Sequence, residues 1–183
     1  MEKPIASSSL RPLKTAFYPC CHDDIEEPLR LLSGYVGRVI FCDINPKLYP
    51  RWKRIYRSLA SDQLPSAEFM IQDAREALSV LPVIDALFYR RDSTGEGGSA
   101  LFVLGDVFLR PLMMRFSSNG GLIFTDGVNS RGGNFKKMIR RSGLIKHGWK
   151  FSTAPEQPYL GQHHLWKISV CRLPTQPTIA LPQ

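Results

Sequence analysis

The sequence predicts an α/β fold: a doubly wound, mostly parallel sheet in three α/β/α layers, closed by a C-terminal antiparallel hairpin. Short runs of continuous Val, Ile, Leu and Phe recur along the chain, and such runs are typical of strands that a parallel sheet buries on both faces. They alternate with helix-like segments, which favours right-handed βαβ crossovers. The last two apolar runs have no helix between them, and this predicts the hairpin.

Five strands are predicted before the hairpin, each followed by a helix. The strands are expected at 14–19, 38–43, 67–74, 83–91 and 121–127, and the hairpin at 148–154 and 163–172. The helices are expected at 25–37, 46–62, 75–82, 99–116 and 134–143. Because proline disturbs a helix beyond its first turn, Pro28 must lie in a first turn, Pro50 predicts an interruption, and Gly105 or Pro111 predicts a kink.

The chain is long enough for one domain with a sizeable core, since it has 183 residues, of which 43% are hydrophobic and 22% charged. Pro, Ser and Thr are frequent at both ends. We therefore expect a single domain over 14–172, a flexible N-terminal tail over 1–13 and a flexible C-terminal tail over 173–183.

The chain is strongly basic, with a net charge of +8. Basic residues cluster at 51–57 and 136–141, followed by Lys146 and Lys150. A basic surface favours a polyanionic partner such as nucleic acid. A solvated helix face explains the same charges, and both interpretations remain open.

The cysteines show neither disulfide nor zinc spacing, so we expect reduced thiols in a cytoplasmic protein. They are Cys20, Cys21, Cys42 and Cys171. Adjacent cysteines chelate poorly, so no metal site is expected from the first pair with His22, His163 and His164.

The first 14 residues lack the apolar run of a secretory signal. The most apolar stretch, 100–109, contains Asp106 and is too short to cross a bilayer, so no membrane partner is expected.

Polar residues follow each of the five predicted parallel strands, at the edge where ligands bind in such sheets. They are 20–24 (Cys-Cys-His-Asp-Asp), Asp43, Gln72 with Asp73, 90–99 and 125–134. Asp43 ends the second strand, roughly 20 residues past the first turn, where an acid is placed to accept hydrogen bonds from a ribose. A helix cap or an Asx turn is the alternative for Asp43, although Asn45 suits that role better.

The segments 90–99 and 125–134 are the other candidates. Glycines free the backbone of 90–99, and Arg90 and Arg91 could hold a phosphate or carboxylate there. A surface loop explains that segment equally well. In 125–134, three polar residues could line a substrate cleft or make turns; they are Asp126, Asn129 and Arg131.

Several segments together resemble the class I S-adenosylmethionine-dependent methyltransferases, over roughly residues 14–172. They are "VIFCDINP", "IQDAREALSVLPVIDALFYRRD", "SSNGGLIFTDG" and the closing "WKF" and "HHLWKISV". The resemblance implies a Rossmann-like methyltransferase fold and S-adenosylmethionine as cofactor.

The resemblance also implies roles for individual residues. The methionine part of the cofactor would be wrapped by Tyr18, Pro19, Cys20, Cys21 and Asp23. The ribose would be held by Asp43, the adenine would meet Ile44, Gln72, Asp73 and Ala74, and the methyl group would lie near Tyr89 and Arg90. By position alone, Asp92 and Asp126 are candidate catalytic residues, and Arg91, Asn129 and Arg131 are candidate substrate contacts.

Two departures from the family pattern matter. The first turn, Pro19-Cys20-Cys21, lacks the family's Gly-x-Gly, whose missing side chains leave room for the ligand. The fourth strand ends in Tyr-Arg-Arg-Asp and lacks the Asp/Asn-Pro-Pro-aromatic segment of amino-group methylases of nucleic acids, which disfavours such an enzyme. A separate feature is the group of acids at the start of the first helix. They would repel the phosphates of a dinucleotide, and they suit a positively charged sulfonium.

Two hypotheses therefore stay open. The chain is a methyltransferase, or a nucleoside-binding protein of that fold, with an unknown acceptor. Alternatively, it is a non-catalytic relative whose basic faces bind nucleic acid or a protein partner.

Overall fold

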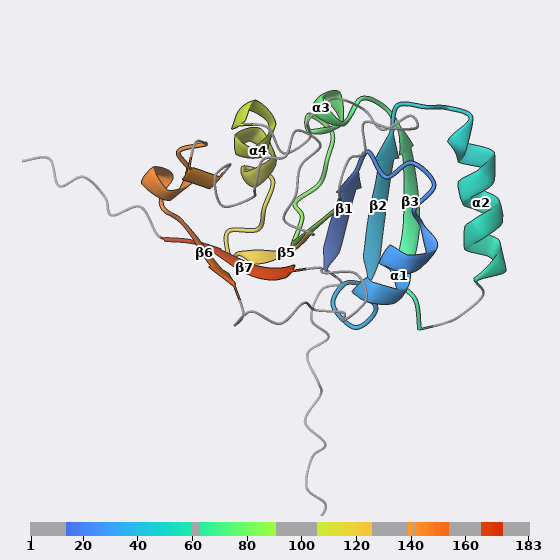
Figure 1. Ribbon diagram of the computed structural model, residues 1–183, viewed down its shortest axis with the longest axis horizontal. Helices are drawn as coiled ribbons and strands as arrows, with labels where there is room; N and C mark the ends of the chain where they lie inside the picture. Colours follow the sequence, from blue (N-terminus) through green and yellow to red (C-terminus); the bar gives the residue numbers. More distant parts are fainter. Residues whose placement is uncertain are drawn as a thin grey trace, which may run out of the picture.

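The computed structural model describes residues 14–59, 63–90, 106–125, 139–140, 142–153 and 166–173, which include a seven-stranded sheet with helices on both faces (Figure 1). The strands are β1 (Thr15–Pro19), β2 (Arg38–Asp43), β3 (Ser66–Ile71), β4 (Ala86–Tyr89), β5 (Gly121–Thr125), β6 (Trp149–Thr153) and β7 (Trp166–Arg172). The predicted tails lie outside the described residues, apart from Leu173.

The sheet has the order β3-β2-β1-β4-β5-β7-β6. The first five strands are mutually parallel, whereas β7 is antiparallel to both β5 and β6. The doubly wound sheet and the C-terminal antiparallel pair are thus confirmed. Because the first five strands are parallel, their carboxyl ends lie at one edge of the sheet, which we call the carboxyl edge. The strand order reverses between β1 and β4, and this switch point is where ligands bind in such sheets.

The described helices are α1 (Glu26–Leu32), α2 (Leu48–Ser58), α3 (Ala74–Ala77) and α4 (Asp106–Met113), and η1 (Leu144–His147) is a 3₁₀ turn that the sequence did not indicate. The predicted interruption at Pro50 is wrong. Pro50 is the third residue of α2, where a backbone N–H has no partner within the helix, so proline fits without a break. Most of the predicted basic helix at 134–143 lies outside the described residues.

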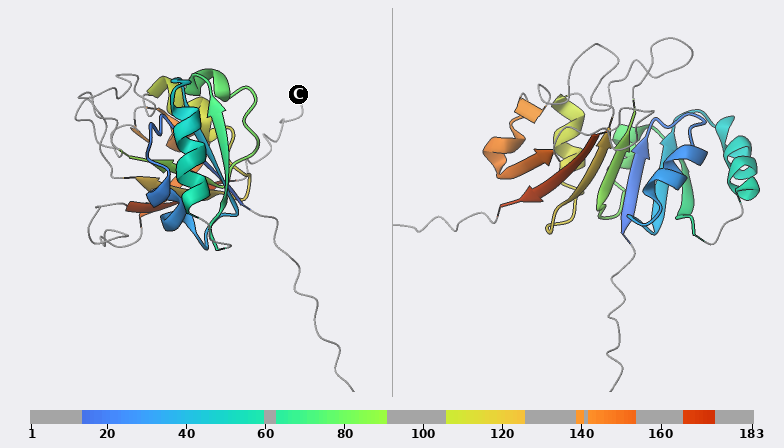
Figure 2. Two further views of the ribbon diagram at one scale, coloured as in Figure 1. Left: turned by 90° about the vertical axis from the view of Figure 1, so that its right-hand side faces the viewer. Right: turned by 60° about the horizontal axis from the view of Figure 1, so that its bottom comes forward.

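The sheet separates two apolar cores because neighbouring strand residues point to opposite faces. On one face Phe17, Ile40 and Leu87 pack with residues of α3 and α4. On the other face Tyr18, Phe41 and Phe88 pack with residues of α1 and α2. Figure 2 shows α1 and α4 on these opposite faces, with α2 outermost beside β3. In the described part of the chain, no helix is long and apolar enough to cross a membrane.

A glycine pair sets the close approach of β4, β5 and β7. A Cβ atom on Gly120 would lie 2.1 Å from the carbonyl oxygen of Val170, and one on Gly121 would lie 2.1 Å from that of Asp85. Gly120 also has a φ of +86°, which favours glycine. The Gly-Gly pair is therefore required for β5 to enter the sheet.

Candidate functional site

The carboxyl edge brings together the predicted cofactor-binding residues that the structure describes. Pro19 pairs with Cys42 across β1 and β2, and Asp43 pairs with Ile71 across β2 and β3. The N–H of Gln72 donates to the carbonyl oxygen of Asp43 at 3.0 Å. The segments that follow β1, β2 and β3 are therefore neighbours, as predicted.

The fourth strand contributes to the same edge. Arg90 follows β4 and contacts Asp24 and Glu27, which lie in and just after the loop that follows β1. Five other predicted residues lie outside the described part of the chain and stay predictions. They are Arg91, Asp92, Asp126, Asn129 and Arg131.

The first loop, residues 20–25 between β1 and α1, has an unusual backbone. Cys20 and His22 have φ values of 52° and 47°, in the left-handed region that glycine adopts most readily. For other residues this conformation costs about 1–2 kcal/mol each. The two positions have the i, i+2 spacing of the Gly-x-Gly motif. The loop thus keeps a glycine-like backbone while presenting a thiol and an imidazole.

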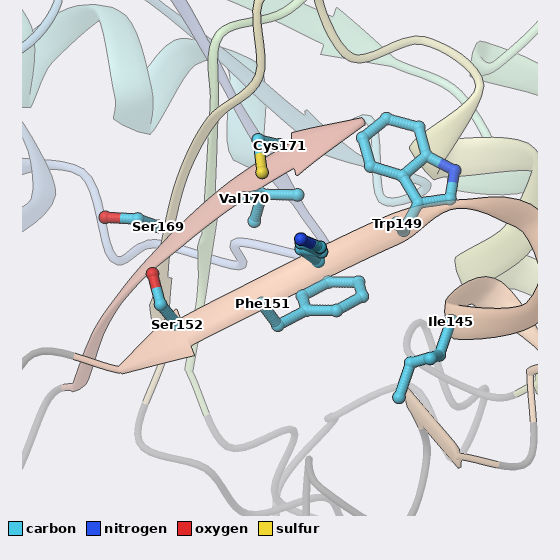
Figure 3. Close-up of a pocket in the computed structure, with 8 residues that line it drawn as sticks. Ile145, Trp149, Phe151, Ser152, Ser169, Val170 and Cys171 are labelled. Carbon is cyan, nitrogen blue, oxygen red and sulfur yellow. The ribbon is translucent and has the colours of Figure 1, made fainter. Parts of the chain in front are cut away.

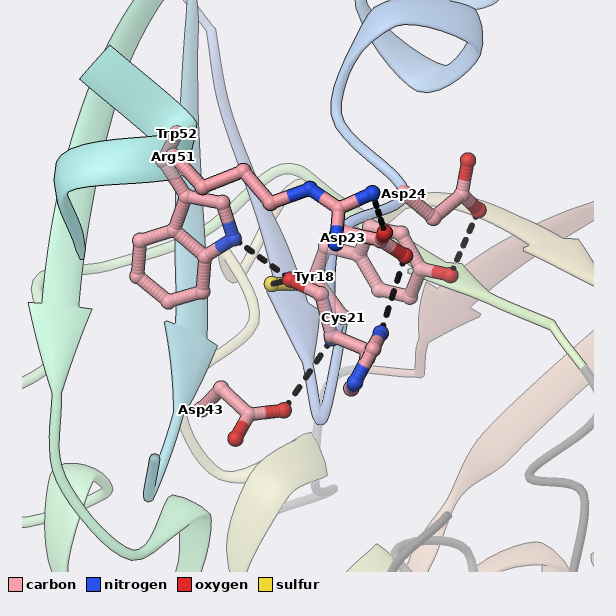
Figure 4. Close-up of polar contacts among 8 residues, drawn as sticks. Tyr18, Cys21, Asp23, Asp24, Asp43, Arg51 and Trp52 are labelled. Atoms are coloured by element: carbon pink, nitrogen blue, oxygen red, sulfur yellow. Dashed lines mark hydrogen bonds and ion pairs between the residues drawn. The ribbon is translucent and has the colours of Figure 1, made fainter. Parts of the chain in front are cut away.

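Backbone and side-chain hydrogen bonds hold the first loop in this conformation (Figure 4). The N–H of His22 donates to Asp43 Oδ2 at 3.0 Å, and the N–H of Cys21 donates to the carbonyl oxygen of Cys42 at 3.1 Å. Trp52 is a fully buried residue of α2, and its indole N–H donates to the carbonyl oxygen of His22. The loop is therefore tied to both β2 and α2.

Asp23 connects the loop to α2 by charge. Its carboxylate lies 2.5 Å from Arg51 Nη2 and 2.8 Å from His22 Nδ1. The hydrogen bond with His22 lowers the pKa of Asp23, and the charge of Arg51 adds to this effect. Since Nδ1 faces the carboxylate, the other ring nitrogen of His22 is left for a further contact.

Asp24 belongs to a second, more buried group. The Tyr18 hydroxyl donates to Asp24 Oδ2 at 2.8 Å. Arg90 lies 3.5 Å from Asp24 and 2.6 Å from Glu27, and these contacts are ion pairs by distance rather than aligned hydrogen bonds. Burial raises the pKa of Asp24, and burial also raises that of Tyr18. This group locks α1 to the end of β4.

Asp43 is the exception among the acids of this edge. The other described carboxylates there, Asp23, Asp24, Glu27 and Asp73, each have an Arg or His partner. Asp43 is half-buried, and within the described residues it accepts only backbone N–H groups, from His22 at 3.0 Å and Asn45 at 2.9 Å. The Asx turn, which was the alternative to ligand binding at Asp43, is therefore present. Asn45 makes a second such turn by accepting from the N–H of Lys47 at 3.1 Å.

Next to this acid, Ile44 is 61% exposed. The adenine contact that the resemblance implies for Ile44 stays a prediction, and the side chain is exposed at the carboxyl edge. Tyr89 and Pro19, by contrast, are buried within the sheet. They belong to the core beneath the loops of the carboxyl edge.

Asp73 has a structural role that the sequence did not reveal. It is the N-cap of α3, and its Oδ1 accepts from the N–H of Arg75 at 2.8 Å. The Arg75 guanidinium also binds both carboxylate oxygens, and the hydrogen bond with Arg75 lowers the pKa of Asp73. Ala74, beside it, is buried. The Asp-x-Arg spacing is a signal that could have identified this pair.

The thiols near the edge differ in access. Cys21 and Cys42 are buried, whereas Cys20 is half-buried. Burial raises the pKa of Cys42 to about 12 and raises that of Cys21. Among the described residues, no group of three or more His, Cys, Asp or Glu side chains could hold a metal ion.

A separate open hollow of about 440 Å³ lies on the β6–β7 pair, away from these residues (Figure 3). Trp149, Phe151 and Val170 line it, together with Ile145 of η1. It contains none of the predicted site residues. The chemistry of the carboxyl edge is therefore distinct from this hollow.

No protein-family model and no curated protein matches the sequence, whereas solved structures match its fold. A methyltransferase from Geobacter sulfurreducens is similar with a TM-score of 0.56, at 14% identity, over 88% of this chain and 72% of that one. SMU.1697c, a putative methyltransferase from Streptococcus mutans in complex with SAH, has a TM-score of 0.55 at 10% identity, over 88% and 91% of the two chains.

Spermidine synthase from Thermotoga maritima is similar with a TM-score of 0.53 at 11% identity, over 87% of this chain; the chain spans only 54% of that enzyme. These similarities agree with the strand order and the antiparallel β7 described above. The chain therefore has the fold of the class I S-adenosylmethionine-dependent methyltransferases, with a first loop that lacks the Gly-x-Gly motif.

Proposed function

We propose that the chain binds S-adenosylmethionine at the carboxyl edge and acts as a methyltransferase on an acceptor still to be identified. The observation that carries this proposal is Asp43. Of the acids in the segments that join β1, β2 and β3 to their helices, it is the one without an Arg or His partner in the described chain, and it lies beside the exposed Ile44.

The residues fit the nucleoside half of the cofactor. A carboxylate offers about four lone-pair sites, and Asp43 uses one on each oxygen for the N–H groups of His22 and Asn45. Two sites remain for a pair of ribose hydroxyls. The backbone bonds hold the carboxylate in one orientation before a ligand arrives, which reduces the entropic cost of binding.

The methionine half of the cofactor has less space, because Cys20 and His22 add side chains where the family has glycine. Cys21, between them, points into the core and takes no space at the edge. The acids of the first loop suit the positive sulfonium and ammonium groups, and Arg90 suits a carboxylate, so the ligand would share groups that already pair with one another. When bound, S-adenosylmethionine supplies a methyl group on a positively charged sulfur, ready for transfer to a nucleophile.

The predicted roles of the remaining residues belong to this proposal. Gln72, Asp73 and Ala74 would meet the adenine edge, and Tyr89 with Arg90 would lie near the reacting methyl group. Asp92 and Asp126 remain candidate proton acceptors for the nucleophile. Arg91, Asn129 and Arg131 remain candidate acceptor contacts.

Isothermal titration calorimetry with S-adenosylmethionine and its demethylated product tests the proposal. We expect saturable binding that Asp43→Asn weakens at least tenfold, because the ribose loses charge-assisted hydrogen bonds. The amide oxygen of the substituted side chain can still accept from the N–H of His22, although the bond from Asn45 is lost, so circular dichroism is used to check that the variant is folded. Glu68→Gln is the matched control, since it changes an exposed acid paired with Arg38 away from the edge, and it should alter affinity less than twofold. No saturable binding of either ligand up to millimolar concentration would refute the proposal.

A further inference from the structure

The outer face of α2 carries an uncompensated basic patch. Lys53, Arg54 and Arg57 are exposed on this helix, on the side opposite the buried Leu48 and Trp52. Helix geometry places residues three and four apart on one face, so the three cations form one surface, which we call the α2 patch. When that end of the molecule faces the viewer, α2 lies in front (left view of Figure 2).

The three cations of the patch differ from most arginines of the described chain in having no acidic partner. Arg30, Arg38 and Arg51 each pair with an acid, as do Arg75 and Arg90. None of Lys53, Arg54 and Arg57 makes an ion pair within the residues that the structure describes. The helix itself contains no Asp or Glu. Mutual repulsion on this face is therefore not relieved by any acid in the part of the chain that the structure describes.

An aromatic ring adjoins the patch. Tyr49 is 37% exposed, and the Lys53 ammonium lies 4.3 Å from its ring centroid. Cations that track a phosphate backbone beside an aromatic ring that can stack on bases are the pattern of single-strand binding surfaces. A membrane surface fits less well, because the outward positions of α2 are Pro50, the patch and Ser58, and the partly exposed Tyr49 is a single ring beside them rather than an apolar face.

We propose that the α2 patch is a binding surface for single-stranded nucleic acid, with Tyr49 stacking on a base and the three cations contacting phosphates. The proposal does not depend on catalysis at the carboxyl edge. It excludes Arg51, which is near the patch but bound to Asp23.

Fluorescence anisotropy with a labelled 20-nucleotide oligouridylate, followed across a salt series, tests this surface on the full chain. The variant Lys53→Gln/Arg54→Gln/Arg57→Gln should bind at least tenfold more weakly at low salt. Its plot of log affinity against log salt should be shallower by about 2, since each lost phosphate contact removes roughly 0.7 from the slope for single strands. Tyr49→Leu should weaken binding about fivefold or more and leave that slope unchanged.

The matched control removes three exposed cations elsewhere, in Arg110→Gln/Lys146→Gln/Lys150→Gln, and should weaken binding less than threefold. Equal losses in the two triple variants would show a net-charge effect and overturn the proposal, as would tighter binding to anionic vesicles than to the oligonucleotide. Calorimetry with S-adenosylmethionine on the α2 variant should give the unmodified affinity. Failure of cofactor binding and failure of the α2 surface are therefore separate results.

Discussion

The end of β2 and the first loop lie side by side and are both acidic, yet their carboxylates have different partners. In and around the loop, Asp23 and Asp24 are held by arginines from α2 and β4. At the end of β2, the partners of Asp43 among the described residues are backbone N–H groups. Under the proposed function, the loop acids assemble the edge, whereas Asp43 serves the ligand. The following predictions test that contrast, from the largest expected effect to the smallest.

Removing the cation that serves the loop acids should have the largest effect on stability. Arg90→Gln removes the cation that lies beside the half-buried carboxylates of Asp24 and Glu27. We expect the free energy of unfolding to fall by about 2 kcal/mol, between the values for exposed and buried pairs. Urea unfolding measures it. Arg30→Gln, which removes an exposed pair with Glu26, should cost less than about 0.5 kcal/mol, and equal costs for the two variants would contradict the contrast.

The end of β3 offers a third acid of known structural role. Asp73→Ala removes the N-cap of α3 and the partner of Arg75, so we expect a loss of about 1 kcal/mol in unfolding free energy. Differential scanning calorimetry would record a lower melting temperature. The neighbouring Glu76→Ala changes an exposed acid and should have a much smaller effect; a loss as large as that of Asp73→Ala would argue against capping.

The left-handed backbone of the first loop predicts that glycine is better than alanine there. His22→Gly and His22→Ala remove the same side-chain contacts, but only glycine adopts a φ of 47° without strain. Glycine should therefore give the more stable variant, by about 1 kcal/mol. Chemical denaturation of the two variants side by side decides this, and greater stability of the alanine variant would contradict the described conformation.

The lowered pKa of Asp73 predicts a small dependence of stability on pH. Because its folded pKa lies below the ordinary value of 3.8, its pairing stabilises the fold fully at pH values well above 3.8. This contribution is lost as the pH falls through the folded pKa. The stability difference between the unmodified chain and Asp73→Asn should therefore be constant near neutral pH and shrink below pH 3.8. Urea midpoints at several pH values measure it, and a difference that grows in acid would be the opposite of the expected sign.

Much of the fold was predictable because it follows from local patterns. The span 38–43 was predicted as a strand and is β2, since its apolar run has clear polar limits. Pro50 misled the prediction because its effect depends on where the helix begins, and α2 begins only two residues earlier. Strand order was not predicted, because apolar runs do not encode their neighbours.

The candidate site was predictable in place but not in detail. The rule that parallel strands end at one edge correctly placed Asp43 near Gln72 and the first loop. The ion pairs could not be inferred, because the residues of the Arg90–Glu27 pair lie far apart in the sequence and meet only after folding. The left-handed backbone of Cys20 and His22 could not be predicted either, because glycine is the residue that normally indicates this conformation in a sequence.

The exposure of the cysteines gives the carboxyl edge a built-in reporter. Cys21 and Cys42 are buried, Cys171 lies on β7 at the other end of the sheet, and Cys20 is half-open in the loop beside Asp43. In a Cys171→Ser background, an alkylating reagent should therefore modify Cys20 first. A ligand that fills the edge should slow this modification, so that mass spectrometry of the intact protein can screen small molecules for binding there.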